Sequence, residues 1–209
     1  MILSRDIGID LGTATTMICD RKGRIIVREP SVVAVDVKTK RVVATGTQAK
    51  QMIGRTPGSI VAVRPLKNGV IADFDMTADM LHSFIFRSDK RSMFSKTRVV
   101  ISVPSGVTEV ERRAVEDAVR SAGAQDVELI DEPMAAALGA GLPVYEPTGS
   151  MIVDIGGGTT GLAILKEGKV VQIEDEPTGG THLTLVLSGN YHVSFEEAEA
   201  IKQDYKRHR

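Results

Sequence analysis

The chain has 209 residues, of which 42% are hydrophobic and 25% charged, and its formal net charge is −1. This composition excludes an intrinsically disordered chain, and a net charge so close to zero excludes a general attraction to nucleic acid, so no nucleic-acid partner is expected. The single cysteine, Cys19, excludes an intramolecular disulfide framework, and no apolar run reaches the roughly 18 residues of a membrane-spanning helix, so a soluble cytoplasmic protein is expected.

The first 45 residues are predicted to form short β-strands, because β-branched residues alternate with polar ones between turn-forming residues. The expected strands are 7–9, 16–19, 25–28, 32–35 and 42–44. A short helix is predicted over 48–53, with Thr47 as its N-cap and Gly54 just past its end. Residues 55–75 carry two prolines and two glycines and are expected to be irregular.

Helices and strands are predicted to alternate in the next part of the chain. A helix should begin near Thr77, where apolar residues recur at helical spacing. The strand 98–103 is apolar on both faces, as in a sheet covered by helices on each side. Thr108 and Glu111 fit a capping box at the start of a helix that runs to Ala122.

A further strand, 127–130, is expected to deliver Asp131 and Glu132 at its carboxyl end. Proline then opens an alanine-rich helix that ends near Gly139. Ligands of open α/β sheets bind beyond the carboxyl ends of the strands, so Glu132 is well placed for chemistry.

Residues 142–147 are the predicted crossover between two halves of the chain. The expected elements after it are a hairpin over 151–166, a strand over 169–174, a Gly179–Gly180 turn, and a helix from Ser194 to about Tyr205. Residues 183–187 fit the start of a helix and a strand equally well. Ser194 and Glu197 have the spacing of a second capping box.

One short pattern occurs twice: an apolar strand, an aspartate, a turn rich in glycine and threonine, and a return strand. Asp10 precedes the first turn at 12–15, and Asp154 precedes the second at 156–159. Glycines let backbone N–H groups approach an anion, and threonine hydroxyls add donors. One such turn is typical of an ordinary hairpin. Two copies about 140 residues apart favour a duplicated α/β unit with two phosphate-binding hairpins that face each other across a cleft.

The two turns, with the stretch Asp131–Ala137 between them, resemble the superfamily of actin, sugar kinases and DnaK-type chaperones. Within it, four stretches are similar to MreB, the bacterial actin: 28–34, 52–58, 64–74 and 103–114. Beyond Gly161 the sequence is more similar to EutJ, a DnaK-related protein of ethanolamine utilisation, over 178–190 and 194–202.

The resemblance implies an α/β, actin-like (ribonuclease H-like) ATPase fold with duplicated α/β halves. Residues 1–146 would form the first half, with a side subdomain inserted at about 29–75, and 147–209 the start of the second. The superfamily's adenine loop, late core strands and C-terminal helix have no counterpart before Arg209, so the second half is expected to be truncated, and a fragment is favoured over a shortened relative. Such a chain is expected to bind ATP weakly, to hydrolyse little of it and to self-associate with or without ATP.

The resemblance also implies ATP and Mg²⁺ as cofactors. The phosphate-binding residues would be Gly12, Thr13, Ala14 and Thr15 in the first turn and Gly156, Gly157, Gly158 and Thr159 in the second. MreB-type sequences usually carry asparagine where this chain has Thr15, whose hydroxyl can still donate to phosphate. Asp10 and Asp154 would hold Mg²⁺ through its waters, unless they only cap their turns, and Asp154 would also serve catalysis.

Glu132 would position the attacking water, because phosphoryl hydrolysis needs an oriented water more than a strong base. Asp131 beside it would point the opposite way. Glu199 and Lys202, three residues apart on one helix face, would lie at the ribose and adenine, although an ordinary solvated ion pair fits them equally well. His182 is expected to be a surface or substrate-cleft histidine.

Met93 and Phe94 would form a small apolar loop that dips into lipid, or else would tuck onto their own domain. The MreB-like function is an ATPase that forms ATP-dependent filaments under the cell membrane and determines cell shape. Its partners would be itself, the inner membrane surface and cell-wall synthesis proteins. The alternative is a EutJ-like chaperone that binds ATP without polymerising. The MreB-like stretches cover more of the chain and favour the first function, and whether this chain hydrolyses ATP is left open.

Overall fold

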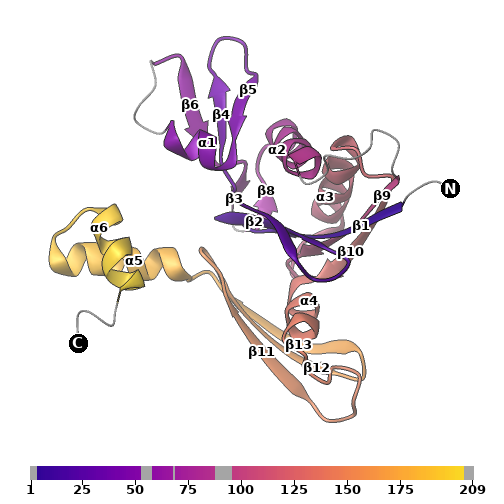
Figure 1. Cartoon of the computed structure of the whole chain (residues 1–209). Coiled ribbons are helices and arrows are strands. Elements are labelled where there is room, and N and C mark those ends of the chain that lie inside the picture. Colours follow the sequence, from indigo (N-terminus) through magenta and orange to yellow (C-terminus); the bar gives the residue numbers. More distant parts are fainter. Residues whose placement is uncertain (1–3, 53–57, 68, 88–95, 205–209) are drawn as a thin grey trace. The chain divides into compact units, whose positions relative to one another are not determined.

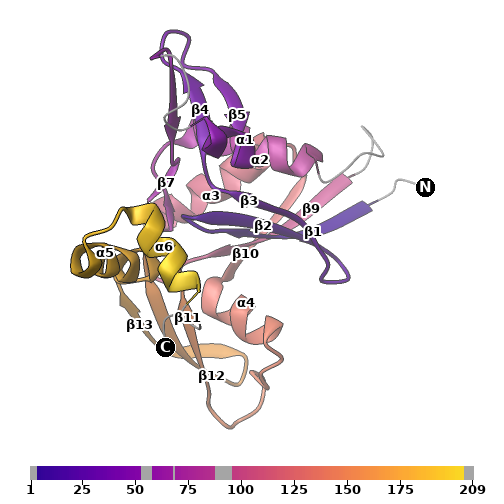
Figure 2. The ribbon, with the colours of Figure 1, turned by 60° about the vertical axis from the view of Figure 1, so that its left-hand side comes forward.

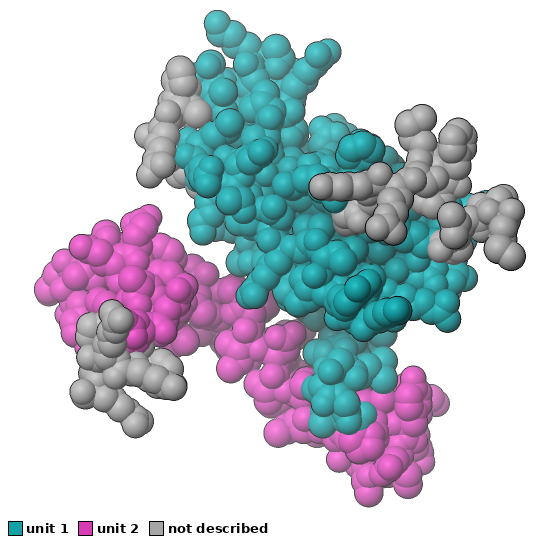
Figure 3. Space-filling view, viewed as in Figure 1, with its two compact units in different colours: residues 1–142 teal, residues 143–209 magenta. Residues whose placement is uncertain are grey.

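The computed structural model describes residues 4–52, 58–67, 69–87 and 96–204. The chain divides into two compact units, Met1–Leu142 and Pro143–Arg209, and each is described by itself (Figures 1 and 3). Met93 and Phe94, the predicted lipid-facing pair, lie outside the described residues. Among the described helices, none is both long enough and apolar enough to cross a bilayer.

A five-stranded sheet forms the body of the first unit, in the strand order β10-β9-β1-β2-β3. Its strands are β1 (Ser4–Leu11), β2 (Thr15–Asp20), β3 (Ile25–Pro30), β9 (Lys96–Val103) and β10 (Asp126–Asp131). The first three form an antiparallel meander, whereas β9 runs parallel to both β1 and β10. The carboxyl ends of β1, β9 and β10 therefore meet at one edge of the sheet.

Helices α2 (Phe74–Arg87) and α3 (Glu109–Ser121) cover one face of this sheet, and α4 (Glu132–Gly139) lies on the other (Figure 2). The core contains Ile7, Ile9 and Leu11 of β1, Val99, Ile101 and Val103 of β9, Met80, Leu81 and Phe84 of α2, and Val115, Ala118 and Val119 of α3. Each fully buried large side chain contributes about 1.5–3 kcal/mol. The predicted cover of β9 by helices on each side is incomplete, because Val100 on the face opposite α2 and α3 is 43% exposed.

A small side sheet, in the order β5-β4-β6, is inserted between β3 and α2. Its elements are β4 (Val33–Asp36), β5 (Val42–Thr45), the helix α1 (Gly46–Gln51) and β6 (Ile60–Val63), followed by a two-stranded ribbon of β7 (Leu66–Lys67) and β8 (Val70–Ile71). Val32, Ala34, Ala44 and Ala49 form its own core. The prediction that 55–75 is irregular is therefore wrong for β6 to β8 and for the start of α2, which begins three residues before Thr77.

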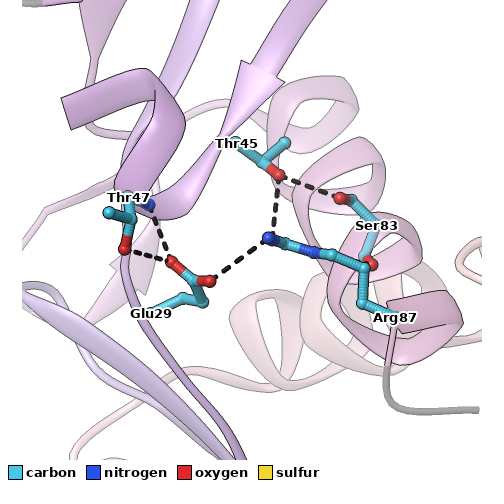
Figure 4. A network of polar contacts seen from close by, with 5 residues as sticks. All are labelled: Glu29, Thr45, Thr47, Ser83 and Arg87. Atoms are coloured by element: carbon cyan, nitrogen blue, oxygen red, sulfur yellow. Dashed lines mark hydrogen bonds and ion pairs between the residues drawn. The ribbon is translucent and has the colours of Figure 1, made fainter. Parts of the chain in front are cut away.

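A polar network, here called the Glu29 network, joins the side sheet to α2 and β3 (Figure 4). The Glu29 carboxylate accepts hydrogen bonds from the backbone N–H and the hydroxyl of Thr47, both at 2.7 Å, and pairs with Arg87 at 3.2 Å. Arg87 also donates to Thr45, whose hydroxyl lies 2.8 Å from that of Ser83. The prediction that Thr47 is the N-cap of this helix is wrong, because Thr45 holds that position and Glu29 takes the donors of Thr47.

The second unit is an antiparallel sheet followed by two helices. Its elements are β11 (Ser150–Ile155), β12 (Thr160–Lys166), β13 (Lys169–Glu176), α5 (Gly180–Tyr191) and α6 (Phe195–Gln203). Residues 183–187, which fit a helix and a strand equally well, are helical because α5 already begins at Gly180. The capping boxes predicted at Thr108 and Ser194 are both confirmed.

Candidate functional site

The first glycine–threonine turn, residues 12–14, connects β1 to β2. A Cβ atom on Gly12 would lie 2.7 Å from the carbonyl oxygen of Thr15, so glycine alone fits there without a backbone shift. The Thr13 hydroxyl accepts a hydrogen bond from the N–H of Gly69 at 2.8 Å. Because accepting uses a lone pair, this bond leaves the hydroxyl proton to be donated, as an anion site requires.

The second turn, residues 156–159, connects β11 to β12. The carbonyl oxygens of its first two glycines accept hydrogen bonds from the N–H groups of Gly180 and Thr181, at 2.9 and 2.8 Å. In a planar trans peptide, the C=O and the N–H of the same unit point in opposite directions. The N–H groups of Gly157 and Gly158 therefore point away from α5, with no side chain on either residue to obstruct an anion.

The start of α5 lies against the second turn because residue 179 is glycine. A Cβ atom there would lie 2.6 Å from the carbonyl oxygen of Gly156, a distance that no larger residue tolerates. The N–H of Gly179 donates to Nδ1 of His182 at 3.2 Å. His182 is exposed and thus supports the helix start from the surface.

Glu199 and Lys202 brace α6 against the first turns of α5. Their charged groups lie 2.6 Å apart, and the Lys202 ammonium also donates to the Gly180 carbonyl at 2.9 Å and to the Thr184 hydroxyl at 2.8 Å. The hydrogen bonds from Lys202 and then Thr184 lower the pKa of the Glu199 carboxyl to about 2. All three ammonium protons therefore have an acceptor within the protein. The ion pair thus contributes to the packing of α6 on α5 and is not an ordinary solvated ion pair.

Glu132 is the first residue of α4 and follows the carboxyl end of β10. Strand β9 lies between β10 and β1, so this position is about two strand spacings, roughly 10 Å, from the end of β1 at the first turn. The preceding carboxylate, Asp131, pairs with Arg112 of α3 at 2.6 Å. Through this ion pair, Asp131 holds α3 on the sheet.

Asp10 and Asp154 occupy equivalent places in the two hairpins. Each is the second-last residue of its strand and half-buried, and they pair with Met17 and Gly161 respectively. Over the described ranges, no group of three or more His, Cys, Asp or Glu side chains is placed to hold a metal ion directly. A Mg²⁺ ion that keeps several of its waters needs few direct protein ligands, so this finding does not contradict the prediction that Asp10 and Asp154 hold Mg²⁺ through its waters.

Three supporting residues were missed by sequence reasoning. Ser31 and Gly69 hold the first turn from the entry and the exit of the side-sheet insertion, and Thr184 links Glu199 to Lys202. The partners of Ser31 and Gly69 in the first turn lie 19 and 56 residues away. No local pattern could have marked these residues.

Comparison with known proteins gives a consistent family signal. The family model described as MreB/Mbl protein matches residues 4–202. The chain is 51% identical over 170 residues to the cell shape-determining protein Mbl of Bacillus cereus, covering 81% of this chain and 51% of that protein. It is 52% identical over 184 residues to the cell shape-determining protein MreB of Escherichia coli, covering 86% and 53%. The chain thus spans about half the length of these curated relatives.

Solved structures agree with the sequence matches. MreB5 of Spiroplasma citri bound to ADP matches with a TM-score of 0.83 and 36% identity, covering 95% of this chain and 61% of that chain. The ethanolamine utilization protein EutJ of Carboxydothermus hydrogenoformans matches with a TM-score of 0.65 and 30% identity, covering 100% and 65%. The residues predicted to be EutJ-like, 178–190 and 194–202, lie inside the span of the MreB/Mbl match.

Proposed function

Because the chain belongs to the MreB/Mbl family, we propose that it acts in an actin-like ATPase that forms filaments and determines cell shape. The predicted α/β, actin-like fold is confirmed by its likeness to MreB5. Relatives at 51% and 52% identity are cell shape-determining proteins, which supports the MreB-like function. The EutJ-like alternative has the weaker structural match, 0.65 against 0.83 in TM-score.

Each of the two turns is proposed to bind phosphate, the first within the first actin-like half (1–146) and the second at the start of the second half (147–209). The N–H groups of residues 12–15 and 157–159 would bind the phosphates of ATP, while that of Gly156 donates to the Thr159 carbonyl at 2.8 Å and closes the second turn. The related MreB5 was solved with ADP. The observation that carries this proposal is the second turn, in which α5 holds the carbonyls of Gly156 and Gly157 so that the N–H groups of Gly157 and Gly158 are left for an anion.

The other predicted site residues would bind the Mg²⁺ waters, the attacking water and the nucleoside. Mg²⁺, when bound, would neutralise charge on the phosphate oxygens. The carboxylates of Asp10 and Asp154 would accept hydrogen bonds from its waters, and Glu132 would orient the water that attacks the phosphate. Glu199 would accept from the ribose hydroxyls, while Lys202 near the adenine stays bonded to α5.

Calorimetric titration of the chain with Mg-AMPPNP and, separately, with adenosine tests this site. The turns bind phosphate, so Mg-AMPPNP is expected to bind at least tenfold more tightly than adenosine. Equal affinity for the two compounds would contradict a phosphate site, whatever the strength of adenosine binding.

We further propose self-association into filaments at the inner membrane surface, together with cell-wall synthesis proteins. The cell-shape role named for the relatives supports this proposal. Sedimentation with Mg-ATP, Mg-ADP and no nucleotide distinguishes the two candidate functions. In a version restored to the full length of the relatives, ATP-dependent pelleting is the expected result, whereas a monomer that binds ATP and stays in the supernatant would favour the EutJ-like chaperone.

A further inference from the structure

We propose that Ser31 is a positioning residue for phosphate binding, because it holds two peptide planes of the first turn from behind. This inference rests on the proposed function of that turn. Ser31 lies between β3 and β4, where the chain enters the side sheet, and it is 0% exposed. A fully buried serine at this place has to find partners for its hydroxyl within the protein.

Ser31 binds the first turn with both its backbone and its side chain. Its N–H donates to the carbonyl of Ala14 at 3.0 Å, and its hydroxyl donates to the carbonyl of Gly12 at 2.6 Å. The hydroxyl of Thr16, also 0% exposed, lies 2.9 Å from that of Ser31. Since the one hydroxyl proton of Ser31 goes to Gly12, Thr16 is the donor in this contact.

These bonds fix the direction of two N–H groups in the predicted phosphate-binding turn. The Gly12 carbonyl shares a peptide plane with the N–H of Thr13, and the Ala14 carbonyl shares one with the N–H of Thr15. Each N–H therefore points away from Ser31. In the second turn, backbone N–H groups of α5 bind the carbonyls of Gly156 and Gly157 in the same way. In both turns, a bonded carbonyl therefore directs the N–H group of the same peptide plane away from its partner.

The hydroxyl matters for binding because the donors are set before the anion arrives. Fixed donors pay no cost of reorientation when charge is bound. Without the Ser31 hydroxyl, the Gly12 carbonyl loses its partner, and an unpaired buried acceptor is costly enough to drive rotation of the peptide plane toward water. That rotation would carry the N–H of Thr13 out of place.

The test compares Ser31→Ala with Thr77→Val, in titrations of the 209-residue chain with Mg-AMPPNP and with adenosine. Thr77 of α2 is the matched control, since it is equally buried and its hydroxyl donates to the carbonyl of Asp73, the residue before that helix, at 2.6 Å. Ser31→Ala is expected to weaken Mg-AMPPNP binding about tenfold, or about 1.4 kcal/mol, with adenosine affinity unchanged. Ser31→Thr, which keeps the hydroxyl, is expected to restore most of the loss.

Thr77→Val is expected to lower the unfolding temperature and to leave both affinities as in the wild type. An unchanged Mg-AMPPNP affinity in Ser31→Ala, or an equal loss in Thr77→Val, would overturn the positioning role. If the wild-type chain shows no preference for Mg-AMPPNP over adenosine, the proposed function fails instead. Amide NMR then still decides the inference: Ser31→Ala shifts the Thr13 resonance if the hydroxyl holds the turn, while that of Thr15, whose plane the backbone N–H of residue 31 still holds, changes less. An unchanged Thr13 resonance overturns the inference.

Discussion

The two adjacent carboxylates at the end of β10 are expected to have separable effects when mutated. In a version restored to the full length of the relatives, Glu132→Ala is expected to retain Mg-ATP binding and to lower ATP turnover about 100-fold or more, because an unoriented water attacks phosphate poorly. Release of inorganic phosphate, measured alongside nucleotide titration, checks this. A turnover equal to that of the wild type would remove Glu132 from the mechanism.

Asp131→Asn is the matched control for that measurement. The substitution breaks the ion pair with Arg112 and is expected to lower the free energy of unfolding while turnover stays within a few-fold of the wild type. If Asp131→Asn slowed turnover as strongly as Glu132→Ala, the two carboxylates would not have separate parts.

Glu199 makes the stability of unit 2 depend on acid pH. The pKa of its carboxyl is about 2 in the folded chain, below the ordinary 4.5, so its pairing stabilises the fold fully above about pH 5 and is lost as the pH falls toward 2. Glu199→Gln is expected to lower the free energy of unfolding by about 1 kcal/mol at pH 7, since the side chain is still one-third exposed. The difference from the wild type should shrink between pH 5 and 2.

Urea unfolding followed by circular dichroism at several pH values measures this difference. The pKa values of Asp20, Asp36, Glu111 and Glu197 are also lowered, by hydrogen bonds, but these groups titrate in both proteins and cancel. A difference that stays constant down to pH 2 would contradict the assigned pairing.

At the scale of elements, the Glu29 network makes the start of α1 intolerant of a side chain. Gly46 has φ +64°, and a Cβ atom there would collide with the Glu29 carboxylate. Gly46→Ala is therefore expected to cost about 1–2 kcal/mol for the backbone alone, plus the loss of the Glu29 contacts with Thr47. Thermal or urea unfolding measures the total.

Gly23→Ala separates these two costs. Gly23 has φ +75° and no neighbouring atom within 4 Å of its Cβ position, so only the backbone cost applies. Gly46→Ala is expected to be the more destabilising by about 1 kcal/mol, and the gap should close in a Glu29→Ala background. Equal losses for the two glycines would show that Glu29 adjusts without cost.

The elements that could be predicted are those whose signals are local. The capping boxes at Thr108 and Ser194 were correct because both partners lie three residues apart. Thr47 was assigned wrongly because its donors go to Glu29, 18 residues earlier, which no local pattern indicates. Strand β6 was missed because its partner is β4, with Val63 paired to Val33, and not a neighbouring stretch of the sequence. Strands β7 and β8 pair with each other and have only two residues each, too few for a pattern to indicate them.

In the candidate site, too, features with a local signal could be predicted and features that depend on distant residues could not. The two turns are contiguous in sequence, so their glycines and aspartates could be identified without a structure. The direction of their N–H groups could not, because Ser31 and α5 determine it from 17 or more residues away. The site roles of the two turns, of Asp10 and Asp154, and of Glu132, Glu199 and Lys202 all stay predictions.

For the whole molecule, attachment to a membrane is the prediction that Met93 and Phe94 carry. Burial of each side chain in lipid contributes about 1.5–3 kcal/mol, which many copies in one filament would multiply. The double variant Met93→Ser/Phe94→Ser is expected to lose pelleting with anionic liposomes. Phe86→Ser, at a phenylalanine of α2 that is 68% exposed, is the matched control and should pellet as the wild type does. Equal pelleting of the wild type, the double variant and Phe86→Ser would contradict membrane attachment through Met93 and Phe94.

The mixed pairing of β1 has a consequence for the order in which the chain folds. Ile9 pairs with Ile18 in the meander but with Ile101 in the parallel part of the sheet, which closes a loop about ten times longer. Loop closure then costs about 2 kcal/mol more, so the parallel contacts form later. During synthesis the meander can close once residue 30 has left the ribosome, whereas β10 must wait for residue 131. The first turn, which would bind phosphate, is therefore expected to fold before Glu132 has been translated.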